Sequence, residues 1–202
     1  MELIPALEIG WLNGWILVCL LYLIYGILLW VFPKDVVARL YDKAGRSKRQ
    51  RVFVYIESLL AVAFFVLIIF TPLKIGTYVF ILGIILYALG LAGFIVALFN
   101  FKNAPLDQPV TGGLYRISRH PEQLMFFSFF GICVAIGSWL ALFIQMISSL
   151  FLHSRILAEE KACLERYGDS YRAYMKRVPR YLLIKTHMKE EGENSKKILE
   201  ED

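Results

Sequence analysis

Residues 124–152 read LMFFSFFGICVAIGSWLALFIQMISSLFL, a run of 29 positions without a charged side chain. As one straight helix this run is about 43 Å long, whereas the hydrocarbon core of a bilayer is about 30 Å thick. Basic residues lie before the run, at Arg119, and after it, at Arg155, and Lys and Arg mark the cytoplasmic side of a membrane protein. We therefore expect a helical hairpin that turns near Gly137-Ser138, with both ends in the cytoplasm. A single tilted crossing is the alternative.

Three more apolar runs lie upstream, at residues 15–32, 52–70 and 75–99, and each is long enough for one membrane crossing. Segment 33–51, between the first two runs, carries seven Lys and Arg residues against two Asp residues, which predicts that it is cytoplasmic. Alternating crossings then place the N-terminus outside the cytoplasm or in a lumen, and the C-terminus in the cytoplasm.

The sequence thus predicts an all-α, polytopic membrane protein with five transmembrane helices, of which the last two form the hairpin. We expect a single integral membrane domain over 1–185, with a cytoplasmic loop at 101–123 and a C-terminal helical region at 157–182. A charged, flexible tail is expected at 186–202. The expected transmembrane helices are about 11–32, 52–71, 75–100, 124–137 and 139–156.

Composition agrees with this class of protein. Of the 202 residues 58% are apolar and 19% are charged, whereas an ordinary soluble domain has about 45–50% and about 25%. This excludes a disordered chain, a collagen-like chain and most soluble enzymes. The net charge is +5. The three cysteines, Cys19, Cys133 and Cys163, are too far apart to predict a disulfide framework or a metal site, and we expect no cleaved signal peptide.

Glu57 is the one charged residue within the predicted transmembrane runs. An ionisable side chain in a membrane segment indicates a function, because burying it without a partner is costly. The alternative is that Glu57 lies near the cytoplasmic surface and pairs with Arg51 or Lys48.

Two expected cytoplasmic segments differ from the rest of the chain. Residues 103–121 contain three prolines and a Gly-Gly pair, which predict an ordered loop rather than a helix. Residues 153–178 carry an apolar stripe at helical spacing. We expect that helix to break at Gly168-Asp169, with Asp169 capping its second half.

Both segments carry motifs. The stretch 111–121, TGGLYRISRHP, resembles the loop T-x-G-x-Y-x-x-x-R-H-P of the isoprenylcysteine carboxyl methyltransferase family, a superfamily that also takes in phospholipid methyltransferases. The second motif follows the hairpin, as in that family. The resemblance covers about 103–182, and Gln123 stands where the family usually has Tyr. The matching residues of the second motif are Arg155, Glu159, Glu160, Leu164, Tyr167, Gly168, Tyr171, Tyr174, Val178 and Pro179.

The resemblance implies S-adenosylmethionine as methyl donor and a lipophilic, membrane-embedded acceptor, without a metal or nucleic acid. In that reading Glu159 or Glu160 binds the donor's ammonium or ribose hydroxyls, and Arg119 and His120 bind its carboxylate. Arg155 orients an acceptor carboxylate. The expected donor-binding residues are Gly113, Tyr115, Arg119, His120, Pro121, Glu159 and Glu160. Those expected to bind the acceptor are Asn100, Gln123 and Arg155, and Arg155 and Glu159 are the expected catalytic residues.

Several acceptors and roles stay open. The reaction expected first is carboxyl O-methylation of an isoprenylated cysteine; N-methylation of an amine-bearing phospholipid or S-methylation of a small thiol are alternatives, for which Glu159 or His120 would serve as base. A sterol-reductase-like enzyme with a nicotinamide cofactor and a non-catalytic membrane module are more distant ones. Each site residue also has a structural alternative. His120 would then only form hydrogen bonds within the loop, Arg116 would bind lipid phosphate, and Glu159 and Glu160 would lie on a solvent-exposed helix face.

Overall fold

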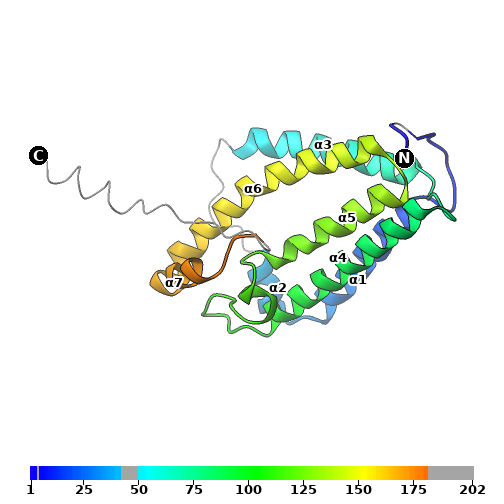
Figure 1. Ribbon diagram of the computed structural model, residues 1–202. Coiled ribbons are helices and arrows are strands. Elements are labelled where there is room, and N and C mark those ends of the chain that lie inside the picture. Colours follow the sequence, from blue (N-terminus) through cyan, green and yellow to red (C-terminus); the bar gives the residue numbers. More distant parts are fainter. Residues whose placement is uncertain (4, 42–49, 182–202) are drawn as a thin grey trace, which may run out of the picture.

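The apolar runs become helices that lie side by side in the computed structural model, which describes residues 1–3, 5–41 and 50–181 (Figure 1), the side chains of 50–54 excepted. No strand occurs in these ranges, where isolated bridges join Glu2 to Ser138 and Asn13 to Pro72, so the all-α prediction is confirmed. The expected tail 186–202 lies outside the described residues. The helices are α1 (Trp15–Val31), α2 (Lys34–Leu40), α3 (Gln50–Phe70), α4 (Tyr78–Lys102), α5 (Leu124–Ala135), α6 (Trp139–Tyr167) and α7 (Asp169–Arg177), with the short 3₁₀ turns η1 (Gly113–Arg116) and η2 (Pro121–Gln123).

The helices present the surface of a membrane protein. By length and composition α4 and α6 are able to cross a bilayer, and three shorter apolar helical segments accompany them at 15–31, 55–70 and 121–135. Large apolar side chains on these helices are exposed, among them Trp30, Leu59, Tyr78 and Leu150. Water would penalise so much apolar surface, whereas lipid covers it without cost.

The α4–α5 pair is the most closely packed pair of helices in the described structure (Figure 1). Glycines make the close approach possible: a Cβ atom on Gly83 would lie 2.4 Å from the backbone N of Ala135, and one on Gly131 2.4 Å from the backbone N of Tyr87. Small residues at helix contacts are the usual means of packing in a membrane, where apolar side chains gain little from leaving lipid. The hydroxyl of Tyr87 donates to the carbonyl of Leu17 (2.8 Å) and so ties α1 to this pair.

The hairpin predicted for 124–152 is present. Gly137 has φ +69°, a left-handed conformation that favours glycine, and the Ser138 hydroxyl caps α6 by accepting from the backbone N of Ala141 (3.1 Å). The N-terminal segment covers this end, because the backbone N of Glu2 donates to Gly137 O (2.8 Å) and the Glu2 carboxylate pairs with Lys74 (2.8 Å).

The first helix begins at Trp15, later than the predicted residue 11. Residues 5–14 are not helical, and the buried Asn13 side chain donates to the carbonyls of Glu8 (2.7 Å) and Ile69 (3.0 Å). These bonds hold the segment against the end of α3. The basic segment that follows α1 contains α2, a helix that the sequence pattern does not predict.

Helix α6 runs unbroken past residue 156, where we expected the transmembrane helix to end, to Tyr167. The break comes at Gly168 (φ +54°). The prediction that Asp169 caps the next helix is wrong, because Gly168 is the N-cap of α7, Asp169 lies in its first turn, and no side chain caps it. The continuity of α6 matters because it carries Glu159 and Glu160 from the apolar run to the loop. Glu57 is half-buried near the start of α3, and the side chains of Arg51 and Lys48 lie outside the described part.

Candidate functional site

The loop after α4 is fastened to that helix by Asn100. The side-chain oxygen of Asn100 accepts a hydrogen bond from the backbone N of Leu114 (2.8 Å). Gly113 has φ +58°, and a Cβ atom there would lie 2.0 Å from the same oxygen. The loop therefore needs glycine at this position, and Asn100 holds the loop in place.

The centre of the site is an ion-pair cluster between the loop and α6, which we call the Glu160 cluster: Arg119, His120, Glu160 and Arg180. Glu160 Oε1 lies 2.9 Å from Arg119 Nη2 and 3.5 Å from His120 Nε2. Glu160 Oε2 accepts from Arg180 Nη2 (2.7 Å) and Nε (3.0 Å). The side chains of Arg119, His120 and Glu160 are 1%, 3% and 4% exposed. Glu160 thus joins the two motifs of the sequence.

The charges of the cluster stabilise one another. Burial by itself would lower the pKa of His120, but the hydrogen bond to Glu122 and the nearby carboxylate of Glu160 outweigh it and raise the pKa to about 9. Burial opposes ionisation of Glu160, yet the nearby imidazole of His120, the hydrogen bonds from Arg180 and the charge of Arg119 lower its pKa to about 2. At neutral pH both groups are therefore charged.

A second face of His120 meets two carboxylates. His120 Nδ1 lies 3.2 Å from Glu122 Oε1 and 3.9 Å from Glu159 Oε2, and the Tyr115 hydroxyl donates to Glu122 (3.4 Å). Glu159 is more open than Glu160, with its side chain 60% exposed. One ligand atom each from His120, Glu122 and Glu159 lies within 4.8 Å of the others, a spacing that suits a cation. Two acidic side chains that face solvent make this side of the site attractive to positive charge.

The chain after α6, at residues 174–180, packs against the loop at residues 115–119. The Tyr174 hydroxyl donates to the carbonyl of Tyr115 (2.7 Å), and Arg119 donates from its backbone N to Pro179 O (3.0 Å) and from Nη1 to Met175 O (3.0 Å). The Ser118 hydroxyl donates to Arg180 O (3.1 Å). Together these bonds fix the loop from both sides.

Arg39 of α2 adds a third support. It donates to Pro105 O (2.8 Å), to Gln108 O (2.6 Å) and to the Tyr167 hydroxyl (3.1 Å). Its guanidinium also lies 5.1 Å from the ring centroid of Phe101. From the sequence this basic segment is only a determinant of topology, and no pattern in it predicts this role.

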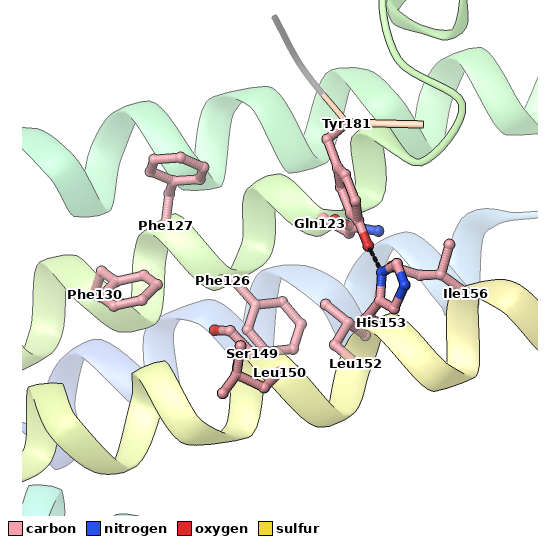
Figure 2. A pocket seen from close by; sticks show the side chains of 10 residues that line it. All are labelled: Gln123, Phe126, Phe127, Phe130, Ser149, Leu150, Leu152, His153, Ile156 and Tyr181. Carbon is pink, nitrogen blue, oxygen red and sulfur yellow. Dashed lines mark hydrogen bonds between the residues drawn. The ribbon is translucent and has the colours of Figure 1, made fainter. Parts of the chain in front are cut away.

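An apolar pocket of about 380 Å³ lies between α5 and α6 (Figure 2). Two of its lining residues, Gln123 and Tyr181, directly follow Glu122 and Arg180 in the chain. Gln123 lies at the same end of the pocket as His153 and Tyr181 (Figure 2). His153 Nδ1 and the Tyr181 hydroxyl form a hydrogen bond there. The apolar lining comes from Phe126, Phe127, Phe130, Leu150, Leu152 and Ile156.

The predicted site residues thus fall into three groups. Tyr115, Arg119, His120, Pro121, Glu159 and Glu160 come together around the cluster, with Pro121 fully buried at the start of η2. Asn100 and Gly113 lie beneath the loop, and Gln123 lines the pocket. Arg155 is exposed one turn before Glu159 on α6.

Four residues of this region were not among the predicted site residues: Glu122, Arg180, His153 and Tyr181. The first three lie within or beside the two motifs, so their place in the sequence could have indicated that they belong to the site. Tyr181 gave none, because only the folded chain brings it to α6.

Comparison with known proteins supports this region as the functional one. Residues 66–170 match the phospholipid methyltransferase family. Over 72 residues the chain is 35% identical to the protein-S-isoprenylcysteine O-methyltransferase of Schizosaccharomyces pombe (strain 972 / ATCC 24843), which is 35% of this chain and 30% of that relative's length. No solved structure matches the chain. The family match covers more than half of the chain, including the loop, the hairpin, Glu159 and Glu160. The chain therefore belongs to the phospholipid methyltransferase family of membrane methyltransferases.

Proposed function

We propose that this protein transfers a methyl group from S-adenosylmethionine to a lipophilic acceptor held in the membrane, most like the carboxylate of an isoprenylated cysteine. One observation carries the proposal. The Glu160 cluster has an acidic rim, formed by Glu122 and Glu159, that suits a charged and water-soluble ligand, and an apolar pocket between two membrane helices begins one residue away, at Gln123. Gln123 and Ile156 line that pocket one and three residues away from Glu122 and Glu159.

The residues present fit such a donor. When bound, S-adenosylmethionine supplies a methyl group on a positively charged sulfur. Glu159 and Glu122 are acidic and face the open side of the cluster, and we assign them to the donor's positive charge and its ammonium group. Arg119 and Glu160 bind each other in the interior, so we assign them to holding His120 and the loop in position.

The acceptor enters from the lipid side. Its apolar part occupies the pocket between α5 and α6, and its reactive group lies at the end that carries Gln123. A carboxylate is already ionised at neutral pH and needs no base, so Arg155, exposed one turn before Glu159, has only to orient it. For an amine or a thiol acceptor Glu159 is the base in reach.

The topology proposed with this function has five crossings within residues 1–185, with the N-terminus outside or lumenal and the C-terminus cytoplasmic. The site then faces the cytoplasm, the compartment from which a water-soluble donor arrives. The apolar surface of the helices and the basic residues around the loop support this orientation.

The test is methyl transfer by the purified chain reconstituted in liposomes, with donor labelled at the methyl group. Three acceptors are compared: N-acetyl-S-farnesylcysteine, phosphatidylethanolamine and a small thiol. We expect label in the farnesylcysteine. Glu159→Gln should reduce the rate of transfer at least tenfold. The control is Glu165→Gln, at an exposed glutamate that pairs with Lys161 on the same helix, and it should leave the rate unchanged. Transfer to phosphatidylethanolamine or the thiol alone would replace the acceptor, and no transfer to any acceptor would contradict the proposal.

A further inference from the structure

The end of the bundle that lies away from the Glu160 cluster is closed by a segment that is not helical. It consists of residues 1–3 and 5–14, which we call the N-terminal segment. Figure 1 shows the N-terminus at this end of the bundle and α7 at the other. The sequence predicted a helix from residue 11, so neither the shape nor the position of this segment follows from its pattern.

The hairpin is short for a membrane at this end. Helix α5 has 12 residues, or about 18 Å, and the three residues of η2 before it add about 6 Å. The hydrocarbon core of a bilayer is about 30 Å thick. Since we place the Glu160 cluster at one membrane surface, the turn at Gly137 lies inside the opposite leaflet rather than in water. Peptide groups there need partners from the protein, because lipid offers none.

The N-terminal segment supplies such partners. The backbone N of Glu2 donates to Gly137 O (2.8 Å) in the turn. The backbone N atoms of Trp139 and Leu140 donate to the carbonyls of Glu2 (2.9 Å) and Leu3 (3.1 Å). These are the first two N–H groups of α6, which have no partner within their own helix. The segment therefore pairs backbone groups that contact with lipid would leave unpaired.

The same segment directs large apolar side chains away from the bundle. Ile9 is 93% exposed, Trp11 is 87% exposed, and Leu12 is exposed beside them. At the same end of the bundle Tyr78 and Trp139 are exposed at the starts of α4 and α6. Tyrosine and tryptophan are enriched where the acyl chains of a membrane meet the head groups. This apolar patch thus continues the lipid-facing surface of the helices.

Charged groups limit how deep the segment lies. The Glu2 carboxylate pairs with Lys74 (2.8 Å), and both side chains remain partly exposed. Glu8 is exposed next to Ile9. A charged side chain is costly in hydrocarbon, so these groups stay on the water side while their apolar neighbours enter the lipid. Amphipathic segments at an interface bury their apolar side chains about 5–10 Å deep.

We propose that the N-terminal segment is a lipid-binding surface, which lies along the boundary of the leaflet opposite the Glu160 cluster. Ile9, Trp11 and Leu12 lie among the upper acyl chains of the phospholipids, and Glu2 and Glu8 lie at their head groups. This role is separate from methyl transfer and holds for either orientation of the chain in a membrane.

Tryptophan fluorescence of the full chain in dioleoylphosphatidylcholine nanodiscs tests the proposal, because both membrane faces are open to the buffer. The signal of Trp11 is the difference between wild type and Trp11→Phe, an exchange at a side chain that packs on little, and thermal unfolding checks that the variant is folded. Phosphatidylcholine brominated near the top of its acyl chains should quench this signal at least about twofold more than the same lipid brominated near the chain ends. Iodide in the buffer should quench it weakly. Trp30→Phe is the positive control, at an exposed tryptophan of α1.

Two neighbouring positions give a second measurement. In a chain whose three cysteines are replaced by alanine, Glu8→Cys and Ile9→Cys are treated with a water-soluble maleimide. A thiol reacts as its thiolate, which forms in water and not among acyl chains, so Glu8→Cys should react at least about tenfold faster than Ile9→Cys. The proposal is wrong if iodide quenches Trp11 more than brominated lipid does, or if the two cysteines react equally fast. It is also wrong if neither quencher reaches Trp11, since protein, such as a second copy of the chain, then covers the segment.

Discussion

Replacing Glu160 by Gln removes the carboxylate on which Arg119 and Arg180 converge. Arg119 is the critical partner, because its side chain is 1% exposed and water cannot take over from the lost charge. The amide of Gln has nearly the same size, so the substitution tests the charge and not the packing. Breaking a buried ion pair on one side costs about 3–5 kcal/mol, since the remaining charge stays buried without compensation. We expect a loss of stability of that order.

The matched substitution is Glu165→Gln, five residues further along α6. Glu165 pairs with Lys161 at 3.9 Å, but the two side chains are 67% and 80% exposed. Exposed pairs of this kind contribute less than about 1 kcal/mol. The two variants lose the same chemical group from the same helix, and they differ only in burial and partners.

Both variants are compared with wild type by thermal and denaturant unfolding in the same detergent. We expect a clear loss of stability for Glu160→Gln and almost none for Glu165→Gln. Proteolysis should show the loop and the segment after α6 opening first in Glu160→Gln, because Arg180 loses its partner as well. Equal stability of the two variants would refute the reasoning that Glu160 joins the two motifs by buried charge.

Three other predictions test separate parts of the structure. The pKa of His120 is raised to about 9 from 6.5, so protonated His120 stabilises the folded protein fully below pH 6.5, and this contribution is lost as the pH rises through 9. The free energy of unfolding should therefore fall by up to about 3 kcal/mol between pH 6.5 and pH 9. In His120→Gln the free energy of unfolding should change much less over the same pH range. Gly131→Ala places a Cβ atom against the backbone of α4 and should lower stability by about 1–3 kcal/mol, whereas Gly26→Ala, with nothing within 4 Å, should be neutral in a thermal melt. Arg39→Gln removes the bonds to the loop 105–108, and limited proteolysis there should become faster; an unchanged cleavage rate would show that the loop does not depend on α2.

The sequence predicts the helices well because each membrane helix is a continuous apolar run. It predicts the hairpin because one run is too long for a single crossing and has basic residues at both ends. It predicts the break at Gly168, where α6 ends, but not that the membrane helix and the helix after it are one unbroken helix. Its apolar run stops near residue 152, yet the helix continues to Tyr167, since straight-chain charged residues favour helix as much as apolar ones do. Helix α2 was missed because basic residues suggested only an orientation.

At the site, the motifs predict Arg119, His120, Glu159 and Glu160, but not which of these side chains are buried and which face outward. Only the fold shows that Arg119 and Glu160 face each other in the interior while Glu159 faces outward. The contribution of Tyr181 depends on a turn after α7 that carries it back to α6, a long-range contact without any local pattern.

The most direct measurement is calorimetric titration of the purified chain in detergent with S-adenosylhomocysteine, with NADPH as the comparison ligand. We predict saturable binding of S-adenosylhomocysteine at one site per chain, at least tenfold weaker binding by Glu159→Ala, and none of NADPH. Absence of S-adenosylhomocysteine binding by wild type, or binding of NADPH in its place, would contradict the assignment of the Glu160 cluster and its acidic rim to a methyl donor.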